Sequence, residues 1–177
     1  MQLSLKLRSL QDAHEHIEQR YEASLFEGVG DDVFRVVSPL ALAFDIDAQE
    51  TGRYRVTGRV AVALELTCGR CLEPFTLPVT AEFDLRYVPR LENAGEGERE
   101  VDEDDLTTAF YSDNRIDLGE LIVEQLHLAL PMKPLCSDDC KGLCPQCGTN
   151  LNTSTCDCGK QWTDPRLAAL KNLVRKQ

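Results

Sequence analysis

The 177-residue sequence lacks a long hydrophobic run. Its first twenty residues contain no uninterrupted apolar stretch, so no secretory signal peptide is predicted. The longest apolar runs, such as LHLALPM at 126–132, are too short to span a bilayer. We therefore expect a soluble, cytoplasmic protein with no membrane partner. In that compartment thiols stay reduced.

Sequence signatures of common catalytic sites are also absent. There is no glycine-rich phosphate loop, no H-E-x-x-H and no G-x-S-x-G. The carboxylates are too dispersed to form a recognisable acid–base pair, and His14, His16 and His127 show no metal-ligand spacing. The sequence therefore predicts neither an enzyme nor a small-molecule substrate.

Basic residues are in the minority, with 19 Lys and Arg against 30 Asp and Glu, which gives a net charge of −11. Residues 92–105 carry eight acidic residues and one Arg. We predict a solvated, mobile loop there, and the alternative is a docking segment for a basic partner. Because nucleic acid repels such a chain overall, any RNA contact must be local, whereas a basic protein partner suits the charge.

Two segments alternate apolar and polar residues as half-buried strands do. The apolar positions are Tyr54, Val56, Val60, Val62, Leu64 and Leu66 in one segment, and Phe75, Leu77, Val79, Phe83, Leu85 and Tyr87 in the other. Between them lies TCGRCLEP, which predicts a long antiparallel hairpin with Cys68 and Cys71 at its tip. Further strands are expected near 2–8 and 33–47, whereas 10–24 fits either a short helix or a strand.

The clearest helix is predicted over 117–130. Asp117 can cap it, Glu120 stands at the reciprocal capping-box position, and Pro131 ends it. A final helix is predicted after Pro165. The expected organisation is an α+β sheet domain over 1–133, a cysteine-rich metal-binding module over 134–163 and a C-terminal helix over 164–177.

The sequence contains eight cysteines, six of them within 136–158. The pair Cys144 and Cys147, in C-P-Q-C-G, has the signature of a zinc knuckle, and Cys156 and Cys158 form a tighter pair. Tetrahedral zinc takes four thiolates, and two short-spaced pairs can supply them from opposite sides. We therefore predict one Zn²⁺ site formed by Cys144, Cys147, Cys156 and Cys158.

The remaining cysteines form a second set of two pairs, Cys68, Cys71, Cys136 and Cys140. If they share a second Zn²⁺, the hairpin tip is tied to the segment after the 117–130 helix. Alternatively, Cys136 or Cys140 belongs to the other site, or Cys68 and Cys71 bind no metal. The fold class is thus α+β: an antiparallel sheet with a long hairpin and a packed helix, plus a small C-terminal zinc-ribbon-like module.

Four motifs occur in an order that resembles a known family: LELTCGRCLEPFTLPV, NRIDLGELIVEQLHLALPMKPLC, CKGLCPQCGTNLN and DPRLAALKNL. The chain is similar to the YceD family, the large ribosomal RNA subunit accumulation proteins, over residues 33–175. The resemblance implies a bacterial or organellar protein needed for accumulation of 23S rRNA, and no catalytic residues. It also implies that Cys68 and Cys71 are the family's hairpin cysteines, and that the ribbon is present in only some members.

The function expected from residues and resemblance is non-catalytic support of large-subunit assembly. The expected partner is large-subunit rRNA precursor or a basic ribosomal protein. The cations that could contact it are Lys133, Lys141, Lys160, Arg166, Lys171, Arg175 and Lys176. Two alternatives stay open: a zinc-ribbon adaptor in transcription or another protein complex, and a thiol oxidoreductase using Cys68 and Cys71.

Overall fold

The computed structural model describes residues 3–7, 13–30, 33–49, 52–90, 107–158 and 166. The predicted acidic loop at 92–105 and the helix predicted after Pro165 lie outside these residues, apart from Arg166. The chain forms two compact units. The first comprises Met1–Leu66 and Phe75–Met132, and the second comprises Thr67–Pro74 and Lys133–Gln177.

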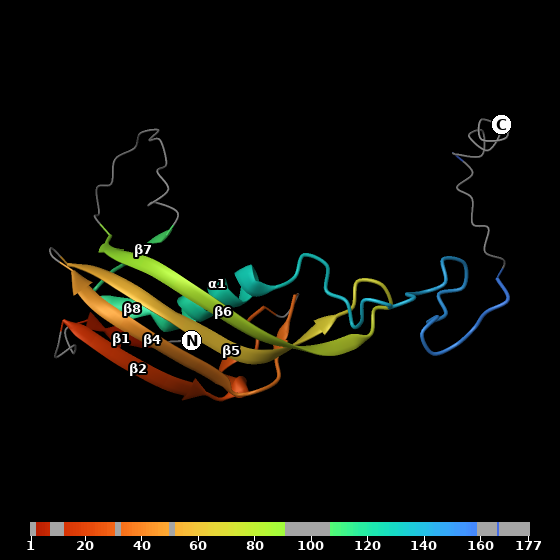
Figure 1. Cartoon of the computed structure of the whole chain (residues 1–177), viewed down its shortest axis with the longest axis horizontal. Helices are drawn as coiled ribbons and strands as arrows, with labels where there is room; N and C mark the ends of the chain where they lie inside the picture. The colour runs from red at the N-terminus through yellow and green to blue at the C-terminus, as the bar shows by residue number, and fades with distance from the viewer. Residues whose placement is uncertain are drawn as a thin grey trace. The chain divides into compact units, whose positions relative to one another are not determined.

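The first unit is built on a sheet with the strand order β2-β4-β5-β6-β7 (Figure 1). Its strands are β2 (His14–Tyr21), β4 (Leu40–Gln49), β5 (Arg53–Thr67), β6 (Pro74–Pro89) and β7 (Thr108–Tyr111). β2 resolves the ambiguity over residues 10–24 in favour of a strand, which a 3-10 turn, η2 (Ala23–Phe26), follows.

The alternating pattern of the two long strands is confirmed by burial. Val56, Val60, Val62, Leu64 and Leu66 on β5 are all buried, as are the apolar positions Val79, Phe83 and Tyr87 on β6. Of the β5 residues that alternate with them, Arg55 and Arg59 are exposed, whereas Thr57, Ala61, Ala63 and Glu65 are half-buried. A period of two places one set of side chains in the core and the other in solvent.

The strand predicted over 33–47 is interrupted. It forms β3 (Arg35–Val36) and β4, both paired antiparallel with β5. Pro39 lies at the break and has no N–H to donate to a ladder. The hydroxyl oxygen of Ser38 instead accepts a hydrogen bond from the N–H of Ala63 at 2.8 Å, which satisfies the β5 backbone at the gap.

The sheet is not wholly antiparallel, because β7 pairs in parallel with β6. The predicted N-terminal strand is β1 (Ser4–Lys6), which forms a separate two-stranded sheet with β8 (Arg115–Asp117). Neither β7 nor β8 was predicted from the sequence, since both strands are too short to show a period.

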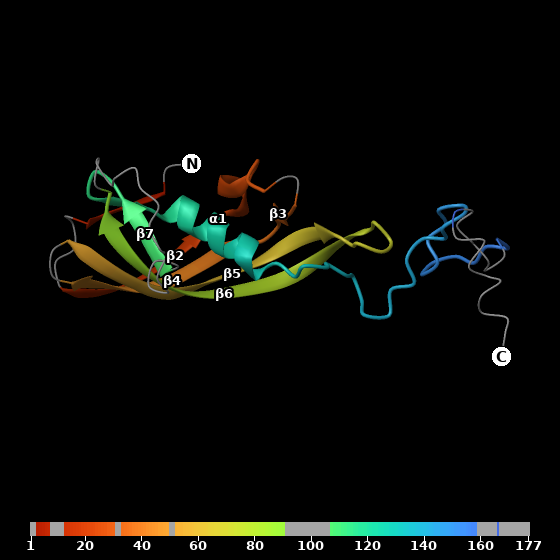
Figure 2. The ribbon, with the colours of Figure 1, turned by 90° about the horizontal axis from the view of Figure 1, so that it is seen from above.

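The predicted helix forms as α1 (Leu118–Ala129) and lies across one face of the sheet (Figure 2). The Asp117 carboxylate caps it by accepting from the N–H groups of Gly119 at 2.8 Å and Glu120 at 3.1 Å. The buried side chains of α1, such as Leu121 and Ile122, join one hydrophobic core with the inward residues of the sheet. Within the described residues, no helix has the length and apolar character to cross a membrane.

Candidate metal centres

The second unit brings all eight cysteines into two groups of four. We name them the hairpin cluster (Cys68, Cys71, Cys136 and Cys140) and the ribbon cluster (Cys144, Cys147, Cys156 and Cys158). Within each group, every Sγ atom lies within 4.8 Å of the others. Cys136 and Cys140 therefore lie with the hairpin pair and not with the ribbon cluster.

Both C-x-x-C segments adopt the same backbone turn. The residue after the second cysteine donates its N–H to the carbonyl of the first, at 3.0 Å from Leu72 and 2.9 Å from Gly148. The first cysteine donates its own N–H to the carbonyl two residues beyond the second, at 2.9 Å for Cys68 and 2.8 Å for Cys144. Each turn thereby holds two thiols at one end of a short, closed loop.

The turn requires a left-handed residue directly after its second cysteine. Gly148 fills that place in the ribbon cluster with φ +71°, and Leu72 fills it in the hairpin cluster with φ +61°. Glycine adopts this conformation without a steric penalty, whereas a side chain costs about 1–2 kcal/mol there. The Leu72 side chain recovers little through packing, because it is 62% exposed.

Donors outside the cysteine side chains point at the sulfurs of the hairpin cluster. The N–H of Cys136 donates to Cys68 Sγ at 3.4 Å, and the amide Nδ2 of Asn152 donates to Cys140 Sγ at 3.3 Å. Such donors favour the thiolate, which is the form that binds a metal, over the neutral thiol.

Two residues that the sequence motifs did not predict hold the hairpin cluster in place. The Arg70 guanidinium donates to the carbonyls of Asp138 at 3.0 Å and Cys140 at 2.9 Å. Asn152 also accepts from the N–H of Lys141 at 2.8 Å. The only sequence signal was their placement, Arg70 inside the C-x-x-C turn and Asn152 inside the loop between the ribbon pairs.

The thiols differ in acidity within each cluster. Hydrogen bonds from the Cys71 and Cys136 backbone lower the pKa of Cys68 to about 6. In the ribbon cluster, hydrogen bonds from Thr149 lower the pKa of Cys147 to about 6. The pKa of Cys158 rises to about 12, and the main cause is the hydrogen bond between its thiol and the Cys147 sulfur.

These pKa shifts come mainly from hydrogen bonds at the sulfurs, and at Cys158 burial and repulsion from the Cys147 charge raise the pKa further. A divalent cation at the centre reverses that balance and favours four thiolates together. The donor set of each cluster is therefore chemically matched to a thiophilic divalent metal.

Sulfur spacing in the hairpin cluster agrees with this chemistry. Four thiolates about 2.3 Å from a tetrahedral zinc would lie about 3.8 Å from one another. Cys68 Sγ lies 3.8 Å from Cys140 Sγ, and Cys71 Sγ lies 3.7 Å from Cys136 Sγ. These separations are far longer than the roughly 2.05 Å of a disulfide, and all eight cysteines are free.

The predicted contact cations are only partly described. Lys133 and Lys141 are exposed in the second unit, and Arg166 is exposed. Lys160, Lys171, Arg175 and Lys176 lie outside the described residues. The three histidines lie in the first unit, where the His127 ring packs edge-on against Phe34 with a centroid distance of 5.1 Å.

Comparison with known proteins finds one matching family model and several curated relatives. The family model "Large ribosomal RNA subunit accumulation protein YceD" matches residues 56–174. A chloroplastic YCED homolog 1 of Zea mays is 33% identical over 144 residues, covering 68% of this chain and 49% of that protein. The YceD protein of Haemophilus influenzae is 27% identical over 148 residues, covering 78% of this chain and 79% of its own.

An uncharacterized protein of Mycobacterium tuberculosis is 37% identical over 120 residues, covering 67% of this chain and 55% of that protein. The chain thus spans about half the length of the first of these curated relatives. No solved structure matches significantly. The family match covers most of the chain and includes both cysteine clusters, and the chain therefore belongs to the YceD family of large ribosomal RNA subunit accumulation proteins.

Proposed function

We propose that the chain is a non-catalytic ribosome-biogenesis factor that supports accumulation and assembly of large-subunit 23S rRNA in the cytoplasm. Each cysteine cluster binds one Zn²⁺, and the two ions fix the fold of the second unit. The family match carries the rRNA role, because the family is described by that activity. The two four-sulfur clusters carry the zinc assignment.

A structural role for zinc follows from the ligand count. Four thiolates complete a tetrahedral shell and leave no position for a reactive water, unlike catalytic zinc sites with three protein ligands. Few regular elements support the described part of the second unit, where Leu143 and Asn150 form an isolated bridge. Structural zinc contributes on the order of 10 kcal/mol, comparable with the whole stability of a domain.

We propose that the whole protein binds large-subunit rRNA precursor or a basic ribosomal protein. The proposed contacts of the second unit with that partner are Lys133, Lys141, Lys160, Arg166, Lys171, Arg175 and Lys176. This assignment rests on their charge and on the exposure of those that are described.

Two measurements test the proposal. Native mass spectrometry should find two zinc ions per chain, and an apo or one-zinc protein would contradict the zinc assignment. The protein should co-sediment with large-subunit precursor particles, and the contact should be located by crosslinking. A protein that sediments free of those particles, or with RNA polymerase, would contradict the ribosomal role.

Thiol exchange is the competing activity, favoured by the lowered pKa of Cys68. It differs from the zinc proposal in the reactivity of the thiols. Alkylation of the metal-loaded protein should leave all eight cysteines protected. Rapid labelling of Cys68 and Cys71 alone would instead favour an oxidoreductase.

A further inference from the structure

The sheet of the first unit has one face that α1 does not cover, which we call the open face (Figure 2). It carries the polar positions of β2, β4, β5 and β6. The register places Arg20 opposite Ala41 and Ala41 opposite Ala61, in one row across three strands. The next row places Glu18 opposite Ala43 and Ala43 opposite Arg59.

At one end of the open face, the charged side chains pair with one another. His14 and His16 contact the carboxylates of Asp47 and Asp45, with Nδ1–Oδ1 distances of 2.6 and 2.7 Å. The Arg55 guanidinium binds the Asp84 carboxylate through two hydrogen bonds, of 2.9 and 2.6 Å. With neutral histidines, the three aspartates outnumber Arg55, so these pairs offer no net positive charge to an anionic partner.

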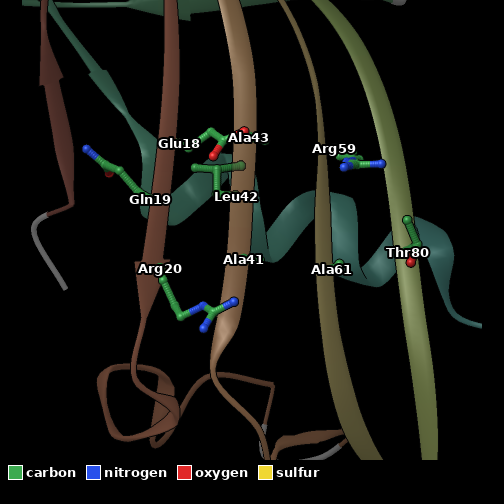
Figure 3. Close-up of a pocket in the computed structure, with 9 residues that line it drawn as sticks. All are labelled: Glu18, Gln19, Arg20, Ala41, Leu42, Ala43, Arg59, Ala61 and Thr80. Carbon is green, nitrogen blue, oxygen red and sulfur yellow. The ribbon is translucent and has the colours of Figure 1, made fainter.

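The other end is different, because small residues replace the charged ones. Ala41, Ala43 and Ala61 form the floor of an open hollow of about 510 Å³, beside which stand Arg20, Arg59 and Thr80 (Figure 3). In Figure 3 the Arg20 side chain bends over β4, and the Arg59 side chain extends toward β6. The alanine methyl groups leave both guanidinium groups standing above the floor.

The two arginines have no partners within the described part of the chain. Both are exposed, and neither makes an ion pair or a side-chain hydrogen bond with a described residue. Glu18 also lines the hollow, but its carboxylate contacts His16 Nε2 at 3.4 Å. The hollow therefore presents two unpaired cations and one carboxylate engaged elsewhere.

We propose that this hollow binds the phosphate backbone of single-stranded RNA through Arg20 and Arg59. The inference rests on the proposed rRNA function and names a contact surface in the first unit. Guanidinium groups form forked hydrogen bonds with phosphate oxygens, and the Thr80 hydroxyl adds a neutral donor.

The lining of the hollow favours the backbone over the bases. Sequence-tolerant base recognition uses aromatic platforms, and none of the lining residues is aromatic. A protein partner would fit an apolar patch better, whereas here long cations surround a small-residue floor. We therefore expect binding that depends strongly on salt and only weakly on RNA sequence.

The spacing of the arginines suits separate phosphates on one strand. They lie two strands and one row apart, which corresponds to about 12 Å between Cα atoms in a regular sheet. Because the side chains extend in different directions, each guanidinium takes its own phosphate. Losing both contacts should reduce the slope of log affinity against log salt by about 1.4, from roughly 0.7 per phosphate.

The test compares full-length, zinc-loaded variants binding a fluorescent single-stranded RNA of mixed sequence. The double variant R20Q/R59Q should bind about tenfold more weakly or worse, the factor expected for loss of one charge-assisted contact. The control R53Q/R90Q removes the same charge from exposed residues outside the hollow and should change affinity much less. The variant E18Q removes the carboxylate and should bind more tightly.

Equal affinity of R20Q/R59Q and R53Q/R90Q would overturn the inference, as would an unchanged salt slope. If R20Q/R59Q loses co-sedimentation with precursor particles but the wild type does not bind free RNA, the RNA assignment is wrong and the surface contacts protein. Failure of the wild type to co-sediment would instead count against the proposed function. Thermal melts close to wild type are required of all three variants, since the substituted residues are exposed.

Discussion

Replacing Gly148 with alanine should weaken zinc binding at the ribbon cluster alone. The residue adopts φ +71°, and its N–H closes the turn onto the Cys144 carbonyl at 2.9 Å. A Cβ at this position would meet no atom within 4 Å, so no clash contributes. The effect of Gly148→Ala is therefore the backbone penalty of the left-handed region by itself.

The magnitude follows from two opposing effects. The left-handed conformation costs alanine about 1–2 kcal/mol, and the lower entropy of unfolded alanine returns about 0.5–1 kcal/mol. The net loss is about 1 kcal/mol, which corresponds to roughly a fivefold loss of apparent affinity when metal binding and folding of the turn are coupled.

The assay is zinc release to a competing chelator, followed by stoichiometry. One ion per chain should leave Gly148→Ala more readily, and the other should behave as in the wild type. Gly69→Ala is the matched control, because it makes the same change inside the other C-x-x-C turn at a residue without positive φ. Its Cβ would lie 3.5 Å from the Pro134 carbonyl oxygen, an ordinary contact.

Equal effects of the two alanine substitutions would refute the reasoning, because the left-handed residue would then have no special role. Early release of both ions from Gly148→Ala would refute it as well, since the clusters would not bind independently. An unchanged release profile would show that the turn observed here does not limit metal affinity.

Three further outcomes are expected. Asn152→Ala removes a donor to a hairpin-cluster sulfur and should weaken that zinc about tenfold or more in chelator competition, because hydrogen bonds to charged groups contribute about 1.5–3 kcal/mol; equal retention of both ions would contradict this. The hydrogen bond from His16 to Asp45 raises the pKa of His16. The stabilisation from this pair should therefore be complete below pH about 6.5 and lost as pH rises through the raised pKa. An NMR titration should show that Asp45→Asn lowers the pKa of His16. Gly58→Ala would place a Cβ 2.5 Å from the Phe44 Cβ and should cost at least about 1–3 kcal/mol, seen as a lower Tm, whereas an unchanged Tm would show that β4 shifts freely.

Local patterns predicted the long elements well. The alternation at 53–66 and 75–88 produced β5 and β6, and the Asp117 cap produced the start of α1. In each case neighbouring residues carry the necessary information, because the burial period and the capping bond are both local. Short spacings predicted the cysteine pairs, but they left open the cluster to which Cys136 and Cys140 belong, which the fold decides.

Long-range pairings could not be predicted in this way. β1 pairs with β8, which is more than a hundred residues away, and β7 adds to β6 in parallel across residues 92–105. Neither short strand has enough residues to show a period. The role of Arg70 was hidden for the same reason, because it acts on a backbone carbonyl 68 residues away, and Asn152 acts on a sulfur 12 residues away without a recognisable motif.

The acidic charge of the chain does not conflict with RNA binding at the open face. Residues 92–105 contain eight acidic residues and one Arg, so they supply seven of the eleven net negative charges. At physiological salt the Debye length is about 8 Å, so a phosphate responds mainly to its immediate neighbours. The charged residues that line the hollow are Arg20, Arg59 and Glu18, whose carboxylate contacts His16, whereas Glu82 and Asp84 line the adjoining hollow with Arg59. If this reasoning holds, neutralising acids within 92–105 should change RNA affinity less than Glu18→Gln does, although it removes far more charge. The opposite ranking would mean that overall charge controls the interaction.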